Sequence, residues 1–196
     1  FRHTLDNNEL NSESGQVAAY GLTIAYARKN EFNRAHEMLA KLQERSPDEP
    51  LYKLAQAELA SAEGKTQLAI ELFEALYLSD KKHPAYLDGY ARALINHGDN
   101  PAAIRILRKI LRHHPEYGWA QGLLGKAYAA DNQPLNAALV EAQRLKTAGY
   151  YERALVLLRQ QVNLPHPDSS DYLKASVNSL IQQIEEEKRQ MENFRL

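Results

Sequence analysis

Apolar residues follow a helical spacing through most of the chain. From Val17 onward they recur at i, i+3, i+4 and i+7, which is the pattern of a buried stripe on an α-helix. Residues 1–16 are instead polar and aperiodic, and we interpret them as a linker or tail. Gly64 and Gly98 suit the left-handed backbone that ends a helix, and Pro47 cannot continue one. The pattern therefore predicts a series of short paired helices over residues 17–196.

One alanine recurs within this pattern at a constant interval. Ala35, Ala69, Ala103 and Ala137 are equally spaced along the sequence, with a period of 34. That period is the signature of the tetratricopeptide repeat, which the chain resembles over most of its length. The predicted fold is all-α: a right-handed superhelical solenoid of tetratricopeptide helix pairs, with about ten helices and a concave binding surface. The units are expected near residues 17–49, 50–83, 84–116 and 117–147.

The period breaks near the C-terminus. The next matching alanine, Ala154, follows Ala137 after only half of the repeat interval. We therefore expect a half-repeat over residues 134–163, whose first helix also serves as the second helix of the fourth unit. A capping helix is expected over residues 170–193, because an open solenoid end must be covered. Its apolar residues, from Tyr172 to Ile184, fit one buried stripe. A coiled coil is the alternative for this last helix, but it has too few heptads.

The composition limits the classes of function. The chain has 196 residues, a net charge of −1 and no cysteine, which excludes disulfides, thiolate metal sites and a cysteine nucleophile. The charge gives no reason to expect nucleic acid or an anionic membrane as a partner, and the apolar runs are too short for a transmembrane segment. Because the sequence starts at Phe1 without a methionine, we interpret it as a piece of a larger protein.

Motifs for catalysis or for metal and cofactor binding are not found. His36-Glu37 begins the zinc-protease pattern His-Glu-x-x-His, but the fifth residue is Ala40. The glycines from Gly118 to Gly125 follow no predicted strand, so they do not indicate a dinucleotide site. We therefore predict no catalytic, cofactor-binding or metal-binding residue in this chain.

The first helix of each predicted unit supplies candidate binding residues. In tetratricopeptide domains these helices line the concave groove, and here they present aromatic, aliphatic and charged side chains. The predicted peptide-binding groove consists of Tyr20, Ile24, Arg28, Leu54, Glu58, Asp88, Arg92, Asn96, Trp119 and Lys126. Trp119, the one tryptophan of the sequence, is either a binding anchor or a side chain packed between repeats. An unfamiliar active site built from Glu58, Asp88, Arg92 and Lys126 is a further hypothesis.

A basic segment lies on the second helix of the third unit. Its cations are Arg105, Arg108, Lys109 and Arg112. They form either a solvated outer face or a docking surface for an acidic partner.

The C-terminal part carries a more particular resemblance. Residues 136–161 (NAALVEAQRLKTAGYYERALVLLRQQ) and 171–189 (DYLKASVNSLIQQIEEEKR) resemble the end of the repeat domain of the bacterial β-barrel assembly-enhancing protease family. The Tyr20-Gly21-Leu22 segment, followed by Tyr26, resembles the start of its first repeat. That family joins a zinc metalloprotease domain to a C-terminal tetratricopeptide domain in the periplasm of Gram-negative bacteria. The resemblance implies that this chain is the non-catalytic recognition half.

The same resemblance implies the partners and the location. The zinc would lie in the parent protease domain, and the partners would be the outer-membrane barrel assembly machinery, unfolded outer-membrane proteins and the chain's own protease domain. The function would be a part in outer-membrane β-barrel assembly and quality control. The absence of cysteine fits an oxidising compartment such as the periplasm. The alternative is a stand-alone tetratricopeptide scaffold or co-chaperone adaptor that binds a peptide in its concave groove, with the cytoplasm as the alternative location.

Overall fold

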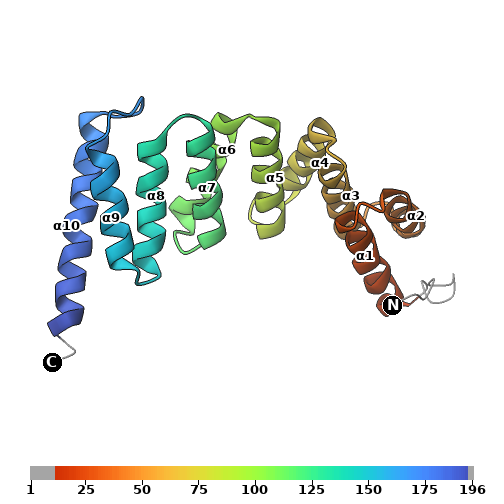
Figure 1. Ribbon diagram of the computed structural model, residues 1–196. Coiled ribbons are helices and arrows are strands. Elements are labelled where there is room, and N and C mark those ends of the chain that lie inside the picture. The colour runs from red at the N-terminus through yellow and green to blue at the C-terminus, as the bar shows by residue number, and fades with distance from the viewer. Residues whose placement is uncertain (1–11, 194–196) are drawn as a thin grey trace. The chain divides into compact units, whose positions relative to one another are not determined.

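The computed structural model describes residues 12–193, and this part of the chain is all-helical (Figure 1). Ten α-helices follow one another within these residues, which divide into two compact units, one up to His97 and one from Gly98. The predicted all-α fold of consecutive helix pairs is confirmed.

The first unit contains five helices: α1 (Glu13–Arg28), α2 (Phe32–Gln43), α3 (Pro50–Ala62), α4 (Thr66–Ser79) and α5 (Pro84–His97). Helix α1 packs against α2 and α3, and α3 packs against α4 and α5. The core between the first three helices is made largely of alanine and leucine side chains, because small residues let helix axes approach closely. Its buried members are Ala19, Ala27, Ala35, Met38, Leu39, Leu42, Tyr52, Ala55 and Leu59.

The N-terminal tail is shorter than the sequence indicates. Helix α1 begins at Glu13, so residues 13–16 are helical rather than part of the tail expected over residues 1–16. Ser12 is the N-cap, and its hydroxyl oxygen accepts a hydrogen bond from the backbone N–H of Gly15 at 3.0 Å. This cap satisfies one of the free N–H groups of the first turn, which explains why a polar stretch starts the helix. Residues 1–11 of the expected tail lie outside the described residues.

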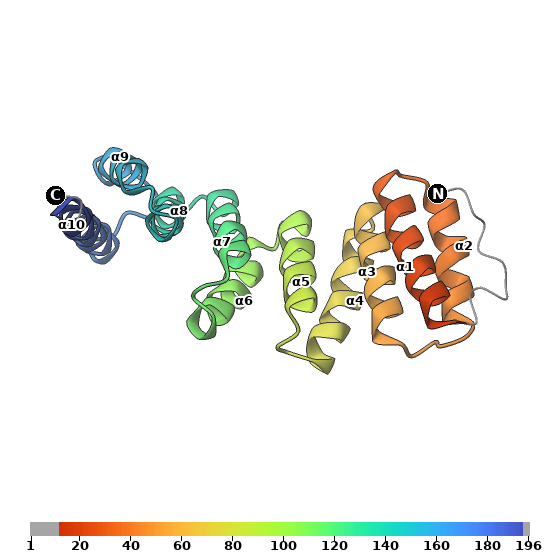
Figure 2. The same ribbon diagram turned by 90° about the horizontal axis from the view of Figure 1, so that it is seen from below.

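The second unit contains α6 (Asn100–His113), α7 (Gly118–Ala130), α8 (Pro134–Thr147), α9 (Tyr151–Val162) and α10 (Asp171–Asn193). Helix α8 packs against both α7 and α9. Helix α10 packs against α9 and also against α8, and Figure 2 shows these three helices nearly end-on. Leu135, Leu158, Val177 and Ile184 are fully buried between them.

The backbone repeats with the same period as the sequence. Asn30, Gly64, Gly98 and Asn132 are each one repeat apart, and all four have positive φ angles, of 59°, 74°, 93° and 55°. Each one ends the first helix of a pair. Gly149, with φ of 79°, follows Asn132 after half a repeat and ends α8 in the same way. The left-handed turn therefore marks α8 as the first helix of an additional pair.

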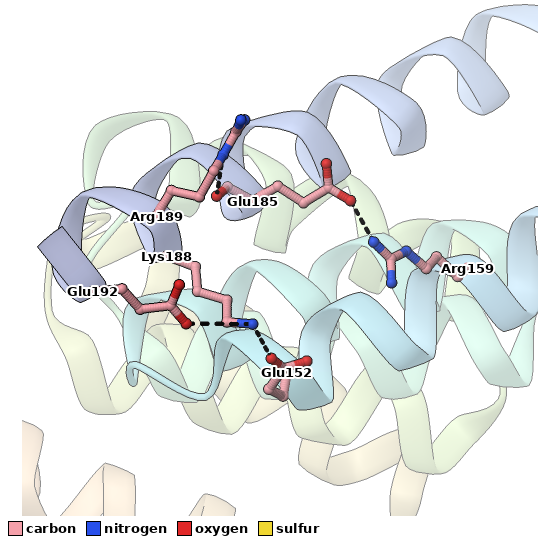
Figure 3. A network of polar contacts seen from close by, with 6 residues as sticks. All are labelled: Glu152, Arg159, Glu185, Lys188, Arg189 and Glu192. Atoms are coloured by element: carbon pink, nitrogen blue, oxygen red, sulfur yellow. Dashed lines mark hydrogen bonds and ion pairs between the residues drawn. The ribbon is translucent and has the colours of Figure 1, made fainter.

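Two kinds of polar contact hold the C-terminal helices in place. The Asp168 carboxylate, in the loop before α10, accepts hydrogen bonds from the backbone N–H groups of Leu135 at 3.3 Å and Asn136 at 2.9 Å, at the start of α8. Ion pairs also join the helices. Figure 3 shows Glu152 and Arg159 of α9 paired with Lys188 and Glu185 of α10, and Lys146 of α8 pairs with Glu187 of α10 at 2.7 Å.

Candidate functional site

The predicted groove residues occupy equivalent places in successive repeats. Tyr20, Leu54 and Asp88 are each one repeat apart, and so are Ile24, Glu58 and Arg92. They lie on the first helix of each pair, on α1, α3 and α5, and these three helices pack side by side in the first unit. We call the surface they form the A-helix face. The predicted groove residues on this face are Tyr20, Ile24, Arg28, Glu58, Asp88, Arg92 and Asn96.

Leu54 does not contribute a free side chain to this face. It is only 5% exposed, so its prediction as a groove residue is wrong. The physical reason is its apolar character: a leucine at this place turns into the helix interface, whereas Tyr20 and Asp88 at the equivalent places keep polar groups at the surface. Periodicity alone could not separate these outcomes, because all three residues occupy the same repeat position.

Apolar side chains do lie exposed at the start of the same helices. Val17 on α1 is 61% exposed and Leu51 on α3 is 37% exposed. These two residues are also one repeat apart, and Trp119 of the second unit has the same repeat position. Val17 and Leu51 form a short exposed apolar row within the first unit, and apolar side chains exposed beside polar groups are typical of a protein-binding surface.

Glu58 is the central ionisable group of the A-helix face. Its side chain is half-buried, and its carboxylate has no hydrogen-bond or ion-pair partner among the described residues. Burial raises the pKa of Glu58 above its usual value; nearby Arg28 opposes this shift, and nearby Asp88 adds to it. The same carboxylate contributes to the raised pKa of the Tyr20 phenol, of which burial is the first cause. A half-buried carboxylate without a partner is a strong hydrogen-bond acceptor available to a ligand.

Asp88 and Arg92 form an ion pair on α5. The Arg92 Nε donates to both carboxylate oxygens of Asp88, at 2.9 and 2.8 Å. This hydrogen bond raises the pKa of Arg92, an effect that partial burial opposes. The pair is spaced i, i+4 on one helix face, so it also supports the helix itself. Asn96, one turn further, is exposed.

The second unit holds the remaining predicted groove residues, Trp119 and Lys126. Trp119 is partly exposed near the start of α7, with its ring 5.8 Å from that of Tyr117 between centroids. Tyr117 in turn stacks on His114 at 4.6 Å. Trp119 is thus neither fully buried nor isolated, and it extends a short aromatic row. Lys126 is exposed on α7, one repeat after Arg92.

The predicted basic docking face lies on α6. Arg105, Arg108, Lys109 and Arg112 are all exposed, whereas the opposite side of the helix buries Ile104, Leu107 and Ile110. The helix is therefore strongly two-sided, with a cationic surface and an apolar one.

The sequence did not predict an uncharged hollow in the second unit. A depression of about 590 Å³ lies between α8 and α10 and is lined by Leu139, Val140, Tyr172, Ser176 and other uncharged side chains. The sequence pattern places Tyr172 in the buried stripe of the last helix, but this prediction is wrong, because the side chain is 82% exposed. One feature of the sequence could have indicated this hollow. Uncharged residues fall on one side of the last helix, at positions 172, 175, 176, 179 and 183.

Two features of other protein classes are missing from the described residues. Across residues 12–193, the structure brings together no group of three or more histidine or acidic side chains that could hold a metal ion. None of the described helices combines the length and the hydrophobicity needed to cross a membrane.

The family of the chain follows from comparison with known proteins. A tetratricopeptide repeat model matches residues 20–86 and 91–156, and a second one matches residues 60–119. Because the former model matches more than half of the sequence, the chain belongs to the tetratricopeptide repeat family. Repeats of this family form protein–protein interaction modules, and the fold is in general a non-catalytic scaffold. No curated protein matches the chain.

Solved structures show the same fold at low sequence identity. MamA 41-end from Desulfovibrio magneticus RS-1 is 14% identical, with a TM-score of 0.58, and the match covers 89% of this chain and 96% of that one. A thermophilic TPR protein from Thermus thermophilus is 13% identical, with a TM-score of 0.54, over 85% of this chain and 99% of that one. A tetratricopeptide repeat protein from Parabacteroides merdae is 17% identical, with a TM-score of 0.50 and coverages of 92% and 77%. At such identities the likeness concerns the fold alone.

Proposed function

We propose that the A-helix face of the first unit binds an extended polypeptide segment that carries apolar side chains and a basic residue. The observation that carries the proposal is the half-buried Glu58 carboxylate, which has no partner among the described residues and lies within electrostatic reach of Arg28 and Asp88. The exposed Val17 and Leu51 side chains supply apolar contact on the same helices.

Each polar group has a role in this proposal. The Glu58 carboxylate accepts a hydrogen bond from a lysine, an arginine or a backbone N–H of the peptide, which replaces the water lost on partial burial. Arg28 and Arg92 donate to peptide carbonyls. Asp88 keeps Arg92 in one orientation, because both of its oxygens accept from Nε. Such preorganised polar contacts fix the register of an extended ligand, while apolar contacts supply affinity.

The test uses a short fluorescent peptide of alternating valine and threonine with one central lysine, and a partner peptide with glutamate in its place. We expect the lysine peptide to bind more tightly. Glu58→Gln should weaken its binding about tenfold, since a charged hydrogen bond contributes roughly 1.5 kcal/mol. Glu37→Gln is the matched control, because Glu37 is an exposed glutamate on α2, outside the A-helix face. Equal affinities for the two peptides, or equal losses in the two variants, would contradict the proposal.

We further propose that this module is the recognition domain of a periplasmic zinc metalloprotease or chaperone involved in outer-membrane β-barrel assembly. The half-repeat at α8, the long helix α10 and the sequence resemblance of residues 136–161 and 171–189 support this assignment. The exposed apolar row suits unfolded outer-membrane proteins, whose strands alternate apolar and polar residues. A stand-alone scaffold or co-chaperone adaptor is the alternative.

The assignment is tested by incubating the purified chain with the detergent-solubilised barrel assembly complex of a Gram-negative bacterium. Co-elution in size-exclusion chromatography is the expected result. Failure to co-elute, together with retained binding of the lysine peptide, would favour the stand-alone adaptor and would leave the proposal of peptide binding intact.

A further inference from the structure

Four cations form a straight stripe on the exposed side of α6. Arg105, Arg108, Lys109 and Arg112 occupy positions i, i+3, i+4 and i+7, which share one face of a helix. All four are exposed. The stripe is about 10 Å long, at a rise of about 1.5 Å per residue. We call this surface the basic stripe.

None of these four cations is neutralised within the described part of the chain. The structure gives no ion pair or hydrogen bond between their side chains and any residue from 12 to 193. The charges on α9 and α10 in the same unit behave differently, since Glu152, Arg159, Glu185 and Lys188 all pair across the helix interface (Figure 3).

The two patterns of charge have different consequences. Paired surface charges at α9 and α10 attach one helix of the chain to the next. Four like charges within two turns of α6 repel one another, and like-charge pairs at i, i+4 destabilise a helix. An external anion of matching shape removes this repulsion, so the basic stripe is complementary to an acidic ligand.

The dimensions of the stripe favour a protein ligand. Nucleic-acid binding domains present broad basic surfaces and a high isoelectric point, whereas this chain has an isoelectric point near 6.7 and a net charge of −1. A single row of cations with helical spacing matches a row of carboxylates with the same spacing on another helix. Pairs of this kind set partner choice and register more than raw affinity.

We propose that the basic stripe docks an acidic helix of a partner protein, with Asp or Glu at positions i, i+3, i+4 and i+7. The basic stripe belongs to the second unit and the A-helix face to the first, and the proposal does not depend on peptide binding at the A-helix face. Two surfaces of this kind would let one module hold two polypeptides at once, which is the property of a scaffold.

The test measures fluorescence anisotropy with two labelled alanine-based peptides of identical composition. One carries four glutamates at i, i+3, i+4 and i+7, and the other carries them at consecutive positions near one end. The stripe variant combines Arg108→Glu with Arg112→Glu. The matched control combines Lys81→Glu with Lys82→Glu, which changes the net charge equally at two exposed cations of the turn after α4. Circular dichroism establishes that both variants keep their helices.

We expect the spaced-glutamate peptide to bind at low salt, and the stripe variant to weaken that binding about tenfold while the control changes it less than about twofold. Binding should also fall as salt is raised, because the contacts are exposed. Equal losses in the two variants, or equal binding of the two peptides, would overturn the proposal. A short DNA duplex and a phosphatidylserine vesicle are tested in the same way. If either one binds more tightly than the spaced peptide, and if the stripe variant abolishes that binding, the proposal is overturned and the stripe is assigned to that ligand.

Discussion

Gly89 on α5 lies against the ring of Phe73 on α4, with no room for a side chain between them. A Cβ atom placed on Gly89 would lie 2.0 Å from Cε1 of Phe73 and 2.5 Å from Cζ. Phe73 is 3% exposed, so its ring is held inside the helix pair. The glycine therefore allows the close packing of α4 and α5, which in turn positions Asp88 and Arg92 on the A-helix face.

Gly89→Ala is expected to destabilise the protein despite the better helix propensity of alanine. The overlap with the Phe73 ring should lower the free energy of unfolding by about 1–3 kcal/mol. Gly21→Ala on α1 is the matched control: the added Cβ meets nothing within 4 Å, so this change should stabilise the protein by about 0.5–1 kcal/mol. Urea denaturation checks both. The double variant Gly89→Ala with Phe73→Leu should recover part of the lost free energy of unfolding. If Gly89→Ala leaves the free energy of unfolding unchanged, the Phe73 ring moves freely and the prediction is wrong.

The second prediction concerns the stability of the residues with positive φ that end the first helix of each pair. Gly64→Ala should lower the free energy of unfolding by about 1 kcal/mol, because a non-glycine residue pays a steric cost at positive φ. Asn132→Gly should be nearly neutral, since asparagine already tolerates this conformation. Thermal unfolding of the two variants measures the contrast. If Gly64→Ala is as stable as the unchanged protein, the turn can adopt a negative φ and the prediction is wrong.

The fold could be predicted from the sequence because its determinants are local and periodic. Equal spacing of Ala35, Ala69 and Ala103 places one small residue in each helix pair, and all three are at most 1% exposed. The left-handed turns at Gly64 and Gly98 follow from glycine itself. Those at Asn30 and Asn132 were not predicted, because asparagine also occurs in many other conformations.

The binding face could be predicted only in part. The period identifies which positions share the A-helix face, but it does not say whether a given side chain turns inward, as Leu54 does. It also gives no information on the contact between Gly89 and Phe73, since the residue one repeat before Gly89 is the buried Ala55. Whether a side chain is buried, and how closely two helices approach, depends on how the side chains of the neighbouring helix pack. The repeat pattern of a single sequence does not show this packing.

Asp168 is expected to stabilise the C-terminal cluster as a cap on a helix distant in sequence. Its carboxylate accepts from the backbone N–H groups of Leu135 and Asn136, and from the Asn136 side chain at 3.1 Å. Asp168→Ala should lower the free energy of unfolding by about 1 kcal/mol, the usual cost of losing a capping side chain. Asp171→Ala is the comparison, because Asp171 is exposed in the first turn of α10. Similar losses in the two variants would argue against a specific cap.

The last prediction concerns pH and the Glu63 carboxylate at the end of α3. A hydrogen bond from Lys65 is the first cause of its lowered pKa; partial burial opposes the shift, and His36 supports it. The contacts are 2.8 Å to the Lys65 Nζ and 2.7 Å to the His36 Nε2. Because the pKa is lower in the folded protein than the usual 4.5, the ionised group stabilises the fold above that value. This contribution is lost as the pH falls through the lower, folded-state pKa.

Glu63→Gln should therefore lower the free energy of unfolding at pH 7 and have little effect at about pH 3. The loss should be about 0.5 kcal/mol, since the Lys65 and His36 side chains are 54% and 51% exposed and water screens their charges. Urea denaturation across this pH range measures it, with Glu37→Gln as the exposed control on α2. A loss that stays constant with pH would assign the role of Glu63 to packing, and the lowered pKa would then have no part in stability. A loss that grows as the pH falls would contradict the direction of the pKa shift, because the neutral, protonated carboxyl would then be the form that stabilises the fold.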